Sequence, residues 1–123
     1  MASTVGPYSP VVRAGQWLIC SGQLGLADGS LVEGGLAAQV TQAIKNAASL
    51  LEREGSGLED VVKTTVFLTD MADFAAMNDA YVAAFGDNRP ARSAFAVVGL
   101  PLGALVEIEA WAYASRSPAN TAG

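Results

Sequence analysis

Three charged side chains in the last third of the chain are the strongest candidates for chemistry. Arg92 lies in the stretch NRPARSAF, where an irregular segment leads into an apolar run typical of a core strand. A planar guanidinium at such a junction can bind a carboxylate or a phosphate through two parallel hydrogen bonds. The alternative is structural, because a cation beside the core needs a partner and Arg92 could form a salt bridge with Glu107 or Glu109.

Glu107 and Glu109 occupy alternate positions of the run ALVEIEAWAYA. If this run is a strand, both carboxylates project from one face, about 7 Å apart. Such a pair can share acid–base work, since the more buried carboxyl has its pKa raised toward neutrality. Alternatively, one glutamate pairs with an arginine and the other is solvated.

Three polar residues, Tyr8 in GPYS, Ser21 in CSGQ and Asn78 in MNDAY, are weaker candidates. The sequence contains no histidine, so Ser21 lacks the base of a hydrolase triad, and no Cys/His zinc site can form. Cys20 is most simply a small core residue. Asn78 interrupts an apolar helix stripe, so its amide must either anchor a neighbouring loop or contact a ligand.

Composition excludes several classes of partner. The formal net charge is −5 and the seven Lys and Arg residues are scattered, whereas nucleic-acid and membrane-surface binders carry clustered cations. No glycine-rich phosphate loop is present, and no apolar run approaches the roughly 20 residues that span a bilayer. We therefore expect a small-molecule ligand or a protein partner, and no nucleotide cofactor. A single cysteine and the lack of a signal-like leader favour a reduced, cytoplasmic protein.

The first half of the chain predicts a hairpin followed by a helix. The runs VVRA and WLICSGQL flank a turn at Gly15, and residues 30–32 are a candidate short strand. Over residues 36–54, apolar side chains recur at three- and four-residue steps, which predicts an amphipathic helix. Its polar side is expected to carry Gln39, Gln42, Lys45, Asn46 and Glu52.

The second half predicts a strand, a helix and two more strands. DVVKTTVFLT is rich in β-branched residues, and Asp70 is expected to cap a helix with the apolar stripe Phe74, Met77, Tyr81 and Phe85. RSAFAVVG and ALVEIEAWAYA supply the last strands. Trp111 and Tyr113 project away from the helices, on a face that a monomer rarely leaves open, so we expect oligomerisation through it.

These elements predict one α+β domain over residues 1–114, with two helices on one face of a mixed sheet. Residues 115–123 have no pattern and are expected to be a flexible tail. The segments GPYS, SGQ, QVTQAIKNAASLLE, DVVKTTVFLTDMADFAAMNDAY, RPARS and LPLGALVEIEAWA, taken in order, resemble the RidA (YjgF-type) family of reactive intermediate deaminases. The likeness extends over residues 5–114.

The resemblance implies a fold similar to that of chorismate mutase, with a curved, mixed, six-stranded sheet and two helices on one face. It also implies a barrel-like homotrimer with sites between subunits. The implied reaction is hydrolysis of 2-imino acids or their enamine tautomers, such as 2-iminobutanoate and 2-iminopropanoate, to 2-oxo acids and ammonia, with no metal or cofactor.

The resemblance also assigns roles to individual residues. Arg92 would hold the substrate carboxylate, and Glu107 would position or deprotonate the attacking water. The residues that match the lining of the site are Tyr8, Ser21, Gly22, Asn78 and Ala94. Leu24 and Gly25 stand where relatives commonly have a proline, which leaves the substrate preference open.

Two other functions stay open at this stage. The same cleft could bind a 2-oxo acid or another small carboxylate without turnover, as a regulatory or chaperone-like trimer. RNA cleavage or translation inhibition, ascribed to some members of the family, is a third hypothesis. The acidic balance and the missing histidine count against it.

Overall fold

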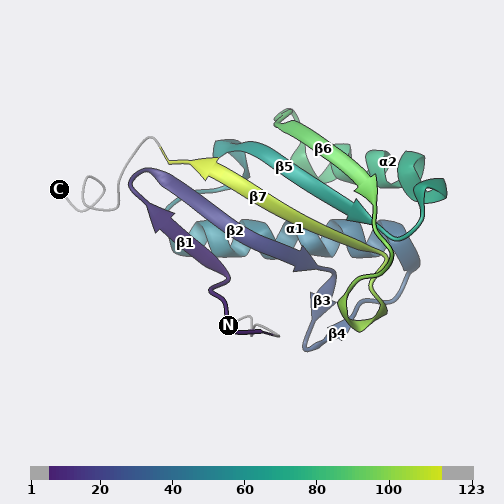
Figure 1. Cartoon of the computed structure of the whole chain (residues 1–123). Helices are drawn as coiled ribbons and strands as arrows, with labels where there is room; N and C mark the ends of the chain where they lie inside the picture. Colours follow the sequence, from purple (N-terminus) through teal and green to yellow (C-terminus); the bar gives the residue numbers. More distant parts are fainter. Residues whose placement is uncertain (1–5, 115–123) are drawn as a thin grey trace.

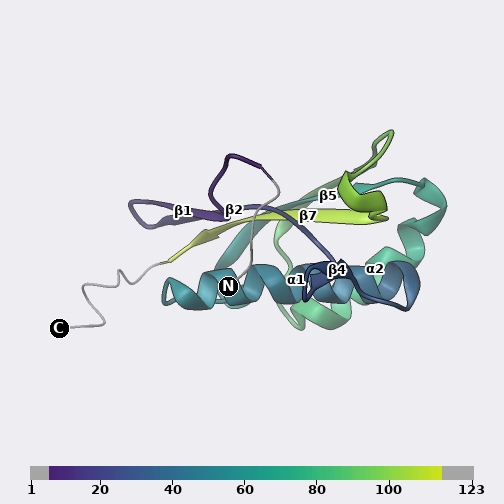
Figure 2. The same ribbon diagram turned by 90° about the horizontal axis from the view of Figure 1, so that it is seen from below.

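Two helices cover one face of a five-stranded sheet and leave the other face open (Figures 1 and 2). The structure is a computed structural model that describes residues 6–114, so the predicted tail at 115–123 lies outside this range. In spatial order the strands are β1 (Val11–Ala14), β2 (Trp17–Leu24), β7 (Val106–Tyr113), β5 (Val61–Leu68) and β6 (Ala91–Ala96). The β5–β6 pair is parallel and the other pairs are antiparallel, which confirms the predicted mixed sheet.

The main sheet has five strands, so the predicted count of six is wrong for residues 6–114. The candidate strand at 30–32 is present as β4 (Ser30–Leu31), but it pairs with β3 (Leu26–Ala27) in a separate two-stranded ribbon. Asp28 and Gly29 join these strands with φ angles of 55° and 83°. Two successive positive φ values are typical of the Asp-Gly hairpin turn, which returns the chain at once and keeps the ribbon apart from the sheet.

The helices α1 (Gly35–Arg53) and α2 (Phe74–Phe85) lie close to the predicted ranges. Three short 3₁₀ turns complete the fold: η1 (Leu58–Asp60), η2 (Met71–Asp73) and η3 (Pro101–Gly103). The Asp70 carboxylate accepts a hydrogen bond from the Ala72 amide at 2.9 Å, so this residue caps η2, which then continues into α2. None of the helices within residues 6–114 has the length and apolar character needed to cross a bilayer.

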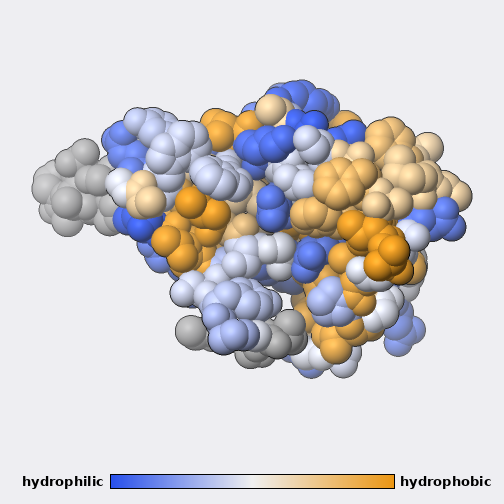
Figure 3. All heavy atoms as spheres, in the orientation of Figure 1, coloured by the Kyte–Doolittle hydropathy of each residue, from blue (hydrophilic) through white to orange (hydrophobic). Residues whose placement is uncertain are grey.

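The hydrophobic core lies between the sheet and the helices, and β7 supplies its centre. The inward-facing residues of β7 are no more than 1% exposed: Val106, Ile108, Ala110 and Ala112. On the open face, Trp17, Trp111 and Tyr113 form edge-to-face ring contacts and are each about 40% exposed. Figure 3 shows this open face, with apolar side chains over the ends of β5 and β6 and the loop that follows.

Two residues from the polar side of α1, Gln39 and Asn46, contact the ends of the sheet strands. Lys45 and Glu52 of the same side are exposed. Gln39 is 6% exposed, and its Oε1 accepts a hydrogen bond from the Leu105 amide at 2.9 Å. The Asn46 amide donates to the carbonyls of Leu24 and Leu26 at 3.0 and 2.9 Å. These bonds tie α1 to the end of β2 and to the start of β7, which are the segments that carry Gly22 and Glu107.

Gly25 allows α1 to approach this junction closely. A Cβ at Gly25 would lie 2.6 Å from the Gln39 Cα and 2.8 Å from its carbonyl oxygen. Both are backbone atoms of a packed helix, so Gly25→Ala must displace α1 and should lower the free energy of unfolding by about 1–3 kcal/mol. Urea unfolding measures this loss. Gly99→Ala is the matched control because nothing lies within 4 Å of its Cβ position, and equal loss in both variants would contradict the steric account.

Candidate functional site

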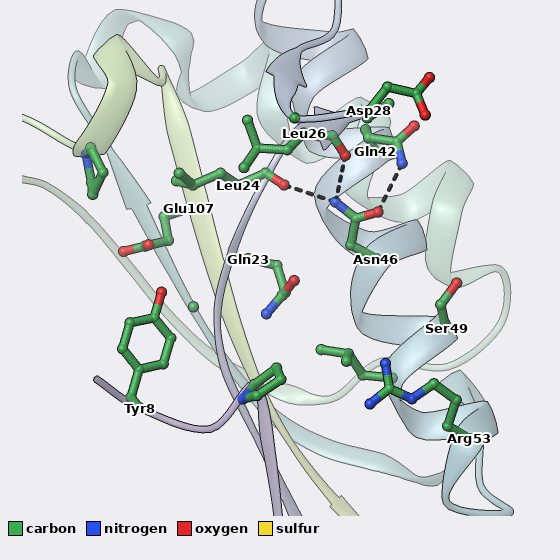
Figure 4. Close-up of a pocket in the computed structure, with 16 residues that line it drawn as sticks. Tyr8, Gln23, Leu24, Leu26, Asp28, Gln42, Asn46, Ser49, Arg53 and Glu107 are labelled. Atoms are coloured by element: carbon green, nitrogen blue, oxygen red, sulfur yellow. Dashed lines mark hydrogen bonds between the residues drawn. The ribbon is translucent and has the colours of Figure 1, made fainter. Parts of the chain in front are cut away.

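Two hollows adjoin at Glu107. The larger, of about 550 Å³, runs between β2, α1 and the segment before β1, and Figure 4 shows Tyr8 and Glu107 on the side of this cleft away from α1. The smaller, of about 400 Å³, also receives Ser21 and Glu109. Both hollows are lined by Tyr8, Gly22, Pro101 and Glu107. The structure thus brings together four of the predicted site residues, namely Tyr8, Ser21, Gly22 and Glu107.

The segment that carries Tyr8 is held to β2 by Ser21. The Ser21 amide donates to the Pro10 carbonyl at 2.9 Å, and the Ser21 hydroxyl donates to the Ser9 carbonyl at 2.7 Å. These bonds fix the chain over the open face of the sheet, on the side away from the helices (Figure 2). Ser21 therefore positions Tyr8, and its hydroxyl is already committed to a backbone partner.

The absence of a side chain at Gly22 leaves the space that the Glu107 carboxylate occupies. The pairing of β2 with β7 shifts register between Cys20 and Gln23, so the backbone at Gly22 departs from the regular ladder. A Cβ at Gly22 would lie 2.7 Å from Glu107 Cδ and 3.0 Å from Glu107 Oε2. Only glycine leaves room for the carboxylate in this position, because any other residue would force the Glu107 side chain to turn away.

The surroundings of Glu107 favour its protonated form. Partial burial raises the pKa of Glu107 above the ordinary glutamate value, and the nearby charge of Glu109 raises it further. Neither glutamate takes part in an ion pair within residues 6–114. The structural alternative, in which Arg92 forms a salt bridge with one of them, is therefore wrong for a single chain. Such a carboxyl can accept and return a proton closer to neutral pH than an ordinary glutamate.

Arg92 lies on the other face of the sheet, which the helices cover, beside α2. It pairs in register with Thr64 on β5, which is fully buried on the helix-covered face. Its guanidinium carbon lies 5.0 Å from the ring centre of Tyr81 and 5.6 Å from that of Phe74, and Nη1 lies 3.7 Å from Met77 Sδ. Arg92 has no ion pair within the described residues.

Arg92 and Glu107 consequently project from opposite faces of the sheet. Glu107 alternates with Val106 and Ile108, which point into the core, so its own side chain points to the open face. Arg92 shares the opposite face with Thr64. One chain does not bring these two side chains together.

Asn78 and Ala94 belong to the region around Arg92. Ala94 is two residues beyond Arg92 on the same strand and packs against the core. Asn78 lies on α2, and its Oδ1 is buried without a hydrogen-bond partner in the described part of the chain. The loop-anchoring role considered for Asn78 is instead performed by Asn88, whose amide donates to the carbonyls of Leu58 and Val61 at 2.9 and 3.0 Å.

Sequence reasoning missed the wall of the larger cleft that α1 supplies. It is lined by Gln42, Asn46, Ser49 and Arg53, which lie on the side of the cleft opposite Glu107 (Figure 4). Their spacing of four, three and four residues is that of one helix face, so a polar stripe was visible in the sequence. No group of three or more metal-binding side chains of the His, Cys, Asp or Glu type occurs within residues 6–114.

Comparison with known proteins identifies the family. The sequence matches the family described as Endoribonuclease L-PSP over residues 1–114. A human protein named 2-iminobutanoate/2-iminopropanoate deaminase is 42% identical over 120 residues, which are 96% of this chain and 86% of the human one. A RutC family protein from Pyrococcus horikoshii is 44% identical over 89% of this chain and 88% of its own.

Solved structures share the fold. The crystal structure of RidA from an Antarctic Psychrobacter species has a TM-score of 0.86 and 42% sequence identity. The match covers 90% of this chain and 91% of that chain. The predicted α+β class and family are thereby confirmed: this chain belongs to the Endoribonuclease L-PSP family, which is the RidA or YjgF family.

Proposed function

We propose that the protein hydrolyses reactive 2-imino acids and their enamine tautomers to 2-oxo acids and ammonia. The substrates are of the 2-iminobutanoate and 2-iminopropanoate type, and the reaction uses no metal or cofactor. The observation that carries this proposal is the 42% identity, over most of both chains, with the human protein that bears this activity in its name. A cytoplasmic location suits the single cysteine, Cys20, which is buried and free.

Arg92 is proposed to bind the substrate carboxylate. The aromatic rings of Phe74 and Tyr81 lie against its guanidinium, and its one hydrogen-bond contact within residues 6–114 is the weak one to sulfur. Most of its five N–H donors are therefore available for a planar anion. A carboxylate held in this way fixes the imine carbon for attack. Asn78 and Ala94 would line this side of the substrate.

Glu107 is proposed to act on water. It would take a proton from a water molecule as that oxygen bonds to the carbon of the protonated imine, which gives a neutral carbinolamine. Glu107 then returns this proton to the nitrogen, and the C–N bond breaks to release ammonia. The hydroxyl proton passes back to Glu107 as the C=O bond forms, and from there to ammonia or solvent. The iminium carbon is already electrophilic, so placing the water and the anion provides most of the catalysis. Tyr8, Ser21 and Gly22 would surround this step.

The proposal requires a second copy of the chain, since Arg92 and Glu107 project from opposite faces of one sheet. We propose a homotrimer in which Arg92 of one subunit faces Glu107 of the next. The exposed aromatic rings of Trp17, Trp111 and Tyr113 support an assembly that covers the open face. A solution mass equal to that of one chain at micromolar concentration would exclude it.

RNA cleavage is the second candidate, because the family description names an endoribonuclease. The net charge of −5 and the absence of histidine disfavour it. Cleavage that disappears on stringent repurification would dispose of this candidate. Binding without turnover is the third, and calorimetric binding of 2-oxobutanoate with no acceleration of imine loss would favour it.

Replacing Arg92 tests the proposed reaction. A threonine dehydratase reaction releases the imine, semicarbazide competes for it, and the yield of 2-oxobutanoate reports deaminase activity. Wild-type protein should accelerate imine loss, and Arg92→Ala should lower kcat/KM by about 100-fold because a bidentate, charge-assisted contact is lost. Arg89→Ala is the matched control, since Arg89 is exposed and donates to the carbonyls of Gly86 and Asn88. Full activity in Arg92→Ala would refute the role.

The pH dependence of activity tests Glu107. A base must be ionised, so kcat/KM should rise with pH as Glu107 loses its proton and then level off. Burial and the charge of Glu109 raise the pKa of Glu107, whereas Arg92 of the neighbouring subunit would lower it. Glu109→Gln should move the midpoint of this rise down, because the charge of Glu109 is one cause that raises the pKa. Glu107→Gln should remove the rise and lower the plateau by about 100-fold. A midpoint unmoved by Glu109→Gln would count against the electrostatic account.

A further inference from the structure

A hydrogen bond between two buried polar side chains lies next to Arg92. The Thr64 Oγ1 and Tyr81 hydroxyl oxygens are 2.7 Å apart, and the two residues are 0% and 4% exposed. Burying two hydroxyl groups in a core costs free energy that their mutual hydrogen bond only offsets. Packing alone does not require these hydroxyl groups. Phe85 lies one helical turn further along the buried stripe of α2 and its ring contacts that of Tyr81, yet it has no hydroxyl group.

This hydrogen bond joins β5 to α2, the two elements that pack beside Arg92 of β6. Thr64 lies on β5 and is the register partner of Arg92 on β6. Tyr81 lies on α2, and its ring centre is 5.0 Å from the Arg92 guanidinium carbon. The bond therefore fixes the tilt of the Tyr81 ring relative to the strand pair that carries Arg92. Burial raises the pKa of the Tyr81 phenol in spite of the nearby arginine charges, so the ring stays neutral at physiological pH.

We propose that Thr64 and Tyr81 are positioning residues for Arg92: their hydrogen bond holds the Tyr81 ring against the guanidinium, which keeps its N–H edge turned toward the substrate carboxylate. This inference rests on the proposed function, because it needs Arg92 to bind that carboxylate. A guanidinium stacked on a fixed ring loses less rotational freedom when a ligand binds. Loosening the ring should thus weaken carboxylate binding while the fold survives.

Calorimetric binding of 2-oxobutanoate to the intact protein tests the inference. Tyr81→Phe keeps the ring and removes the hydroxyl, and Thr64→Val keeps the shape and removes the partner. Each should raise Kd by about tenfold, and the double variant should be no weaker than either single one, because both remove the same bond. Thr64→Ser, which retains a hydroxyl, should restore most of the affinity.

Two controls separate positioning from general damage. Ile44→Val removes one core methylene on α1, which carries neither Arg92 nor the rings in contact with it, and should leave Kd unchanged at the same folded fraction. In an Arg92→Lys background, Tyr81→Phe should add no further loss, since the planar group that it orients is gone. A structural role alone would weaken binding equally in both backgrounds, and that result would overturn the inference.

The outcome for Arg92 itself distinguishes the two proposals. If Arg92→Ala abolishes binding while folded Tyr81→Phe and Thr64→Val bind like wild type, the positioning role is wrong and the proposed carboxylate site stands. If Arg92→Ala binds 2-oxobutanoate as tightly as wild type, the carboxylate site is wrong, and the positioning role falls with it.

Discussion

The alternation of β7 between a buried and an open face is the constraint on which the rest of the structure depends. Every second side chain of this central strand is small or branched and enters the core, where Ala110 and Ala112 let the helices pack close to the sheet. The intervening positions must then face away from the helices. Glu107 and Glu109 stand on the open face for this reason, together with Trp111 and Tyr113.

The same alternation of side chains along β6 determines the face of the sheet on which Arg92 lies. Parallel pairing of β6 with β5 places Arg92 beside Thr64, on the face that α2 covers. Its guanidinium then lies against aromatic rings at the edge strand of the sheet, separated from Glu107 by the sheet itself. In the proposed function, each chain therefore supplies a cationic half-site at one edge of its sheet and a carboxylate half-site on its open face. The proposed trimer follows from this division, since two half-sites of different copies can complete each other.

Much of this fold could be predicted because its signals are local. Gly15 marks the hairpin turn, and the alternating pattern of Val106 to Tyr113 shows which side of the last strand is buried. The polar side of α1 could not be assigned in the same way. Gln39 and Asn46 look solvent-facing from helical periodicity alone, yet segments distant in sequence cover them and use their amides. Such contacts depend on tertiary packing, which a short stretch of sequence does not reveal.

The candidate site was predictable in part for the same reason. Glu107 could be placed on the open face from its own strand, but the face of Arg92 depends on which strand β6 pairs with. The absence of an Arg92–Glu107 contact within one chain was therefore invisible in the sequence. So was the hollow at Gly22, because a register shift in the pairing with β7 creates it.

The central claim is that Arg92 and Glu107 work together from different copies of the chain. Subunit mixing tests it most directly. Arg92→Ala and Glu107→Gln proteins, each expected to be about 100-fold less active than wild type, are unfolded, mixed in equal amounts, refolded and assayed for imine hydrolysis. If neighbouring subunits supply the two residues, random assembly leaves about one quarter of the sites intact, and the mixture should regain about that share of wild-type activity. No recovery from a mixture that reassembles to the wild-type mass would contradict the account.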